Sequence, residues 1–147
     1  MPERETLERA KRDRAQGKSA STQAGEFVRE EIHHIREGKH GARSTKQVIA
    51  IGLSKARRAG VKLPAPPKSA GKQTQRQAAR DRARGAAKRR PSPKRGRASL
   101  RALKRYGRSA ASPASLARQA RSTARRRTKR DRSASARKAA RTRESMP

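Results

Sequence analysis

The sequence predicts a mostly disordered chain that contains one small all-α helical hairpin. The 147 residues carry a formal net charge of +32, and only 1% of them are aromatic. All of the valines and isoleucines and the one phenylalanine fall within residues 27–63. A chain with few large apolar side chains and a high net charge cannot offset the entropy lost on ordering. We therefore expect a folded island at these residues and disorder over most of the rest.

Composition divides the chain into three parts. Residues 1–25 are expected to form a charged helix and a linker, residues 26–63 the hairpin, and residues 64–147 a Pro-hinged, Arg/Lys-rich disordered tail. Residues 68–147 hold 28 Lys or Arg against three acids. A tail with charge of one sign repels itself when free. Isolated Ala/Arg-rich helices within it are compatible with its composition.

The first segment has the features of a short polar helix. Pro2 suits a first helical turn and Gly17 suits a helix end, so a helix is predicted over residues 2–16. Leu7 is the one large apolar residue inside it, which leads us to expect a solvated helix. The Gly- and Ser-containing residues 17–25 predict a flexible link.

The hairpin is predicted from apolar residues at helical spacing in residues 26–37 and from a second helix that begins near Ser44. Ser44 and Gln47 have the spacing of a capping box, and Gly60 ends the second helix. A short connection favours an antiparallel pair. The hairpin has too few large apolar side chains to be stable alone. We therefore expect it to pack against a second copy or another protein. The predicted core and interaction residues are Phe27, Val28, Ile32, Ile35, Val48, Ile49, Leu53 and Ala56.

The connection and the second helix also carry a recognisable pattern. It consists of His40-Gly41, a Ser-Thr-Lys-Gln cap at residues 44–47 and the run VIAIGLSKAR at residues 48–57. This pattern, KHG-x-RSTKQ-[AV]-IAIGLS-x-ARRAG, resembles that of a bacterial family of small basic proteins without an established activity. The resemblance implies a shared helical module and no particular chemistry. In composition, the tail resembles the tails of protamines and linker histones.

The tail is the strongest functional signal, and it predicts binding to nucleic acid. Arg forks bind phosphates bidentately, and binding by such a tail is expected to depend on salt more than on base sequence. Arg95-Gly96-Arg97 resembles the core of an AT-hook, in which two arginines enter a narrow minor groove, although Ala98 replaces the usual proline. The candidate nucleic-acid-binding residues are Lys55, Arg57, Arg58, Lys88, Arg89, Arg90, Arg95, Gly96, Arg97, Arg125, Arg126, Arg127, Lys129 and Arg130.

Several classes of chemistry find no support in the sequence. The absence of cysteine excludes disulfides and thiolate zinc sites. No strand pattern or phosphate-binding Gly-rich loop is present, so we predict neither an enzyme nor a cofactor. His33, His34 and His40 raise the question of a metal site. Glu30, His33, His34 and Glu37 share one helix face, but metal-binding bundles need donors from several helices, and here one short helix supplies all four. A polar outer helix face is the expected explanation, and no metal is predicted.

The leading hypothesis is a nonenzymatic, largely sequence-independent nucleic-acid-binding protein that compacts or organises DNA, with DNA favoured over RNA. The alternative is a protein-interaction module at residues 26–63, with the basic tail as a tether to RNA or the ribosome. Binding at an anionic membrane surface ranks third, because the tail lacks the apolar face of an interfacial helix. No apolar run approaches the roughly 20 residues of a membrane span, and a cytoplasmic, nucleoid location is expected.

Overall fold

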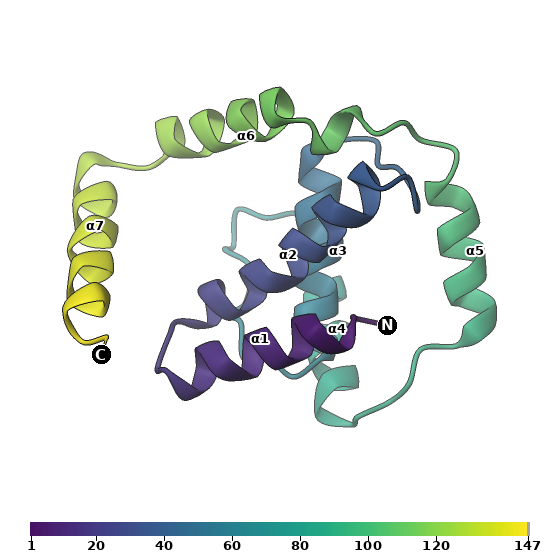
Figure 1. The fold of residues 1–147 in the computed structure, drawn as a ribbon, viewed down its shortest axis with the longest axis horizontal. Coiled ribbons are helices and arrows are strands. Elements are labelled where there is room, and N and C mark those ends of the chain that lie inside the picture. Colours follow the sequence, from purple (N-terminus) through teal and green to yellow (C-terminus); the bar gives the residue numbers. More distant parts are fainter. Residues whose placement is uncertain (147) are drawn as a thin grey trace.

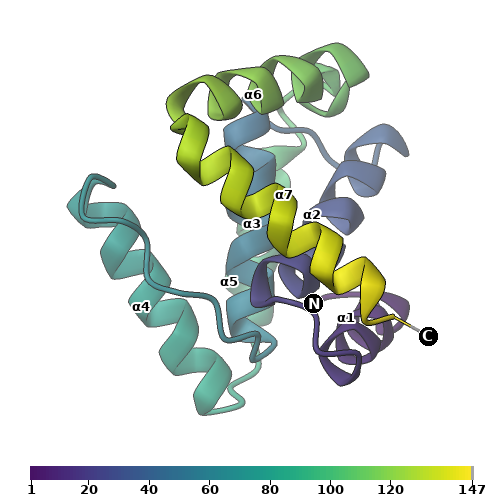
Figure 2. The same cartoon turned by 90° about the vertical axis from the view of Figure 1, so that its left-hand side faces the viewer.

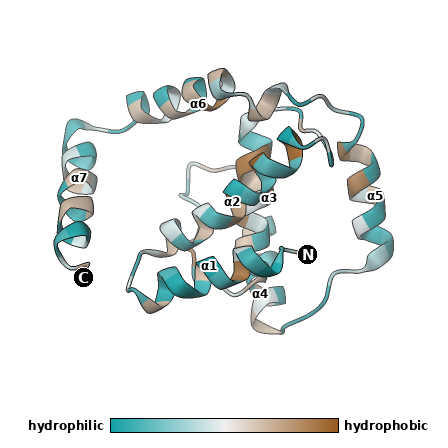
Figure 3. Cartoon of the chain, viewed as in Figure 1, coloured by the Kyte–Doolittle hydropathy of each residue, from teal (hydrophilic) through white to brown (hydrophobic). Residues whose placement is uncertain are grey.

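Two antiparallel helices, α2 and α3, form the centre of the molecule (Figure 1). The computed structural model describes residues 1–146, and within them the chain forms seven α-helices and one 3₁₀ helix. Hydrophobic residues gather on the central pair (Figure 3). The helices are α1 (Arg4–Ala15), α2 (Ala20–Arg36), α3 (Thr45–Arg58), α4 (Lys72–Ala86), α5 (Pro93–Leu103), the 3₁₀ helix η1 (Ser109–Ala111), α6 (Pro113–Arg126) and α7 (Lys129–Glu144).

The α2–α3 hairpin is present and Ser44 caps α3, but only the Ser44 half of the predicted capping box forms. The Ser44 hydroxyl accepts a hydrogen bond from the Gln47 N–H, and the Gln47 side chain in turn accepts one from the Arg43 N–H. The two helices approach closely where Gly52 meets Val28. Around this crossing, apolar side chains divide into two clusters rather than one seam. One contains Ala10, Ala24, Phe27, Ala56 and Leu63, with Leu53 against it; the other contains Ile35, Ala42, Val48, Ala110 and Ala111, with Ile32 against it.

Helix α1 packs along α2, so the expectations of a solvated first helix and a flexible link are wrong. Its buried residues are small or polar: Thr6 is fully buried and Ala10 is 6% exposed. Helix α2 begins at Ala20, inside the predicted link, because Ser19 caps it by accepting a hydrogen bond from the Thr22 N–H. Small side chains allow α1 and α2 to approach each other closely without a row of large apolar residues, which is the pattern that predicts a packed helix.

The prediction of a mostly disordered chain, and with it of an intrinsically disordered tail, is also wrong, because residues beyond 68 form four α-helices. Helix α4 packs along α3 (Figure 2) through Ala78 and Asp81, which are 3% and 1% exposed. The Ser54 hydroxyl donates a hydrogen bond to Asp81 at 2.7 Å, and Arg58 Nε donates a second one to Asp81 at 2.8 Å. One of the three acids in this basic region therefore anchors its first helix to the hairpin.

The chain beyond α5 returns to the hairpin through main-chain hydrogen bonds. The Gly41 N–H donates to the Leu103 carbonyl at 3.1 Å, and the Ala42 N–H donates to the Gly107 carbonyl at 3.2 Å. A Cβ atom at Gly41 would overlap the carbonyl oxygen of Tyr106. The absence of a side chain at Gly41 therefore allows the α2–α3 connection and the segment after α5 to lie in contact.

Helix η1 then covers one end of the hairpin. Ala110 and Ala111 are 5% and 0% exposed and pack in the cluster of Ile35 and Val48. The Thr45 hydroxyl donates to the Ala110 carbonyl at 2.7 Å, which ties η1 to the start of α3. Residues of the same chain thus occupy part of the apolar seam for which a second copy was expected.

Helices α6 and α7 complete the described chain. Ser112 caps α6 by accepting from the Ser115 N–H, and Pro113 occupies its first turn. Thr128 and Asp131 form a capping box at the start of α7, which extends at the margin of the molecule with no helix packed against it among residues 1–146 (Figure 1). None of the described helices combines the length and apolar character needed to cross a bilayer.

Candidate functional site

Exposed, unpaired cations dominate the surface of the C-terminal helices. Of the 28 Lys and Arg residues from Lys68 onward, all except Arg84 are exposed. Within the described residues, none of these 28 side chains makes an ion pair with a carboxylate; the cationic partners in the ion pairs all lie between Arg4 and Arg58. The positive charge of this region therefore remains available to an external anion.

Helix α6 presents this charge on a defined face. Arg118, Arg121 and Arg125 recur at three- and four-residue spacing, which places them on one side of a helix. With Ser122 and Arg126 they line an open hollow of about 480 Å³. The other side of α6 carries Leu116, Ala120 and Ala124, which line a second hollow of about 310 Å³ with Thr45 and Ile49 of α3, together with Gln119, Thr123 and Arg127. Contact with α3 therefore directs the arginine row outward.

The structure distributes the predicted tail residues over several elements. Lys88, Arg89 and Arg90 lie in the connection between α4 and α5. Arg125 and Arg126 end α6, Arg127 follows it, and Lys129 and Arg130 begin α7. All eight are exposed. Five of these cations lie at the α6–α7 junction. Arg118 and Arg121 extend the row along α6, and they were not among the residues predicted from the sequence.

The resemblance to an AT-hook does not extend to conformation. Arg95, Gly96 and Arg97 lie in the first turns of α5, where the Gly96 N–H donates to the Ser92 carbonyl at 2.9 Å. An AT-hook would place these residues along a groove floor, whereas a helix directs the two arginines to different sides. Pro93 suits the first helical turn and starts a helix instead.

The three predicted binding residues of α3 lie in internal contacts. Lys55 forms ion pairs with the buried carboxylates of Glu30 and Glu31. Arg58 pairs with Asp81 at 2.8 Å, and Arg57 is partly buried, with a fully buried Nε that has no hydrogen-bond partner in the described structure. The charges of Lys55 and Arg58 therefore contribute to holding α2, α3 and α4 together.

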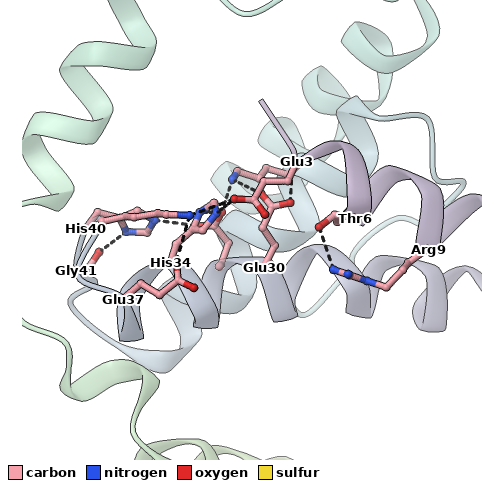
Figure 4. A network of polar contacts seen from close by, with 11 residues as sticks. Glu3, Thr6, Arg9, Glu30, His34, Glu37, His40 and Gly41 are labelled. Atoms are coloured by element: carbon pink, nitrogen blue, oxygen red, sulfur yellow. Dashed lines mark hydrogen bonds and ion pairs between the residues drawn. The ribbon is translucent and has the colours of Figure 1, made fainter.

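A buried ionic cluster joins α1, α2 and α3 (Figure 4). Glu30 and Glu31 are 3% and 1% exposed. Burial raises the pKa of Glu30, but hydrogen bonds from the Glu3 N–H, Lys55 and Thr6 outweigh this effect and hold the pKa below its ordinary value. Burial likewise lowers the pKa of Lys55, and its pairing with the two carboxylates raises it overall. Lys55 is therefore held as a charged group inside the protein.

Two histidines extend this cluster, and a third does not. His34 Nε2 lies 2.8 Å from Glu3 Oε1, and hydrogen bonds from His34 and Lys39 lower the pKa of Glu3 to about 2. His40 is 8% exposed and its Nε2 lies 3.2 Å from Glu31 Oε2. His33 is exposed. The expectation of a polar outer helix face therefore describes His33, whereas His34 and His40 face an internal carboxylate.

Residues 11–69 match the model of a family of unknown function, DUF6496. The match begins within α1 and ends just before α4, so it covers the hairpin and its connection and leaves the basic helices outside. It agrees with the resemblance to a family without an established activity, which the sequence pattern of the hairpin suggested. A comparison with curated proteins and another with solved structures found no significant match.

Proposed function

We propose that the protein is a nonenzymatic, largely sequence-independent nucleic-acid-binding protein that organises DNA in the bacterial nucleoid. The observation that carries this proposal is the set of 28 basic residues from Lys68 onward, nearly all exposed and none ion-paired within the described chain. Nucleic acids are the abundant polyanions of a cell, and each neutralised phosphate releases a counterion.

The helices supply this charge in a form suited to phosphate. The row Arg118, Arg121 and Arg125 projects from a helix that rests on α3, so its spacing is set before a ligand arrives. Preorganised groups lose less conformational entropy on binding than groups on a disordered chain. Arg also binds phosphate oxygens bidentately, which Lys does not.

The fold gives less support to a protein-interaction module at residues 26–63. That hypothesis rested on an apolar seam that a partner would cover. Ala110 and Ala111 cover Ile35 and Val48, and α1 contributes Ala10 to the cluster that contains Phe27. The arginine surface requires no such partner, and duplex DNA is therefore the ligand we favour.

A comparison of two triple variants tests the proposal. In the first, Arg118, Arg121 and Arg125 of α6 are changed to Gln; in the matched control, the exposed residues Lys11, Arg12 and Arg14 of α1 are changed to Gln. Each removes three positive charges from a helix. The affinity for a fixed duplex is measured over a range of salt concentrations, and the slope of log affinity against log salt is compared with that of the wild type.

If the α6 row contacts phosphates, its variant should reduce the magnitude of the slope by up to about 2.7, at about 0.9 for each lost contact, and the α1 variant should reduce it far less. Equal effects of the two variants would show that net charge alone is responsible and that α6 is not the interface. A duplex RNA and a single-stranded DNA of equal charge are measured in parallel, and tighter binding to RNA would contradict the preference for DNA.

A further inference from the structure

Glu31, His34 and His40 converge on one small volume at the end of α2. Figure 4 shows His34 and His40 side by side there. Glu31 and His34 lie one turn apart on the helix, and the connection to α3 brings His40 back toward them. One ligand atom from each residue lies within 4.8 Å of the others. The two imidazole rings are nearly perpendicular, at 83°, with centroids 6.0 Å apart.

The hydrogen bonds of the two histidines direct a lone pair of each ring toward this volume. His40 Nδ1 lies 3.0 Å from the Gly41 carbonyl oxygen, which only accepts, so Nδ1 carries the proton. The same reasoning places the proton of His34 on Nε2, which faces Glu3 Oε1 at 2.8 Å. A histidine that binds a metal is neutral, and its other nitrogen then supplies the lone pair. These nitrogens face Glu31 at 3.2 Å from His40 Nε2 and at 3.8 Å from His34 Nδ1.

Acceptors that face one another repel unless a cation lies between them. Glu31 is 1% exposed, and its buried Oε1 has no hydrogen-bond partner among the described residues. Lys55 forms an ion pair with that oxygen, but the ammonium is shared with Glu30, to which it donates at 3.0 Å. Glu30 and Glu31 share the single ammonium group of Lys55, which sets two buried carboxylates against one cation of fixed charge. Leaving a buried carboxylate uncompensated is costly, and a bound cation would remove the cost.

The donor set identifies the class of cation. Imidazole nitrogens with one carboxylate suit Zn²⁺ and other divalent first-row transition metals, whereas Mg²⁺ prefers oxygen ligands alone. In metal-binding proteins, a ligating histidine commonly donates its other N–H to a carboxylate or a backbone carbonyl, which sets its tautomer. Glu3 accepts in this way from His34, and the Gly41 carbonyl does so from His40.

We propose that Glu31, His34 and His40 bind a divalent transition-metal ion, with Zn²⁺ as the probe. Glu31 supplies an oxygen, His34 supplies Nδ1 and His40 supplies Nε2. The side chain of His34 is 13% exposed, so the site lies near the surface and has an entry path. Water completes the coordination on that side.

The ion would fasten the connection between α2 and α3 to the body of α2. The same connection donates its Gly41 and Ala42 N–H groups to Leu103 and Gly107, which lie beyond the tail's first helix. Metal binding would therefore stabilise the docking of the α5–η1 segment on the hairpin. This role is independent of nucleic-acid binding.

The test uses the full-length protein after treatment with a chelator, without nucleic acid. Zn²⁺ binding is measured by calorimetry, Co²⁺ binding by its visible absorption, and exchange of the Gly41 and Ala42 amide protons by nuclear magnetic resonance. The variants are His34→Gln and His40→Gln, and the control is His33→Gln, which changes the exposed neighbour of His34. Thermal unfolding of each variant is followed by circular dichroism.

We expect one Zn²⁺ per chain with micromolar or tighter affinity, a loss of about tenfold or more in His34→Gln and His40→Gln, and no loss in His33→Gln. Zn²⁺ should slow exchange of both amides, and Mg²⁺ should not. If His40→Gln fails to fold, His34→Gln decides, because its ring is partly exposed. Failure of the wild type to bind Zn²⁺, or equal losses in all three variants, would overturn the proposal.

Discussion

Gly52 of α3 lies directly against the backbone of Val28 in α2, and a Cβ atom added at Gly52 would lie 2.7 Å from Val28 Cα. The change Gly52→Ala should therefore push the two central helices apart. We expect it to lower the free energy of unfolding by about 1–3 kcal/mol, as overpacking does elsewhere. The control is Gly25→Ala in α2, where a Cβ atom meets nothing within 4 Å and should raise helix stability. Chemical denaturation measures both, and a neutral Gly52→Ala would contradict the close crossing.

Asp81 should hold α4 on α3. The change Asp81→Ala leaves the donors of Ser54 and Arg58 without their acceptor, and hydrogen bonds to a charged group contribute about 1.5–3 kcal/mol. We expect a loss of stability in that range in denaturant unfolding. Glu144→Gln removes an exposed acid from α7 and should change nothing. Equal stability of the two variants would mean that α4 is held by other contacts.

The contribution of Asp81 should depend on pH. Burial raises its pKa, but hydrogen bonds from Ser54, Arg58 and Gln77 outweigh burial and hold the pKa below 3.8. A carboxyl group whose pKa is lower in the folded state stabilises the protein above its unfolded pKa of about 3.9. The stabilisation is lost as the pH falls through the folded pKa. The stability difference between the wild type and Asp81→Asn should therefore be constant above pH ~5 and shrink below pH ~4. A constant difference across this range would contradict the assignment.

Because η1 covers one end of the hairpin, we expect a position in this basic region where a larger side chain lowers stability. Ala111 is fully buried between Ile35 and Val48. Ala111→Leu should therefore lower the free energy of unfolding by about 1–3 kcal/mol. Ala136→Leu makes the same change on the exposed surface of α7 and should leave the melting temperature unaltered. If both variants melt like the wild type, η1 is not part of the core.

The sequence was informative where large side chains recur at helical spacing. The α2–α3 pair followed from Val28, Ile32 and Ile35 and from the Ser44 cap. The tail was misread because its contacts use residues that carry little signal, namely Ala78, Ala110 and Ala111. A single aspartate among many arginines gave no reason to expect a buried anchor. These contacts link residues distant in sequence, which periodicity within one segment does not reveal.

The buried cluster illustrates the same limit for the site. Glu30 and Glu31 are adjacent acids in the sequence, and their partner Lys55 lies on another helix, so spacing within α2 gave no indication that they pair with it. His40 lies in the connection, so spacing along α2 gave no indication that it returns to Glu31. Composition likewise did not reveal that, among the described residues, no carboxylate pairs with the arginines of α6. The overall positive charge could be read from the sequence. The fold was needed to tell the cations that form ion pairs from those that form none.

That division also concerns the acids of the N-terminal region. Each of the eight acids before residue 38 pairs with a basic partner between Arg4 and Lys55. A free acidic segment tethered to an arginine-rich one would act as an intramolecular decoy at high effective concentration, and an incoming polyanion would have to displace it. In this protein the acids already pair with neighbouring basic groups, so they do not compete for the arginines. Under the proposed function, no activating event is needed to expose the arginines, and binding to a polyanion should depend on concentration and salt.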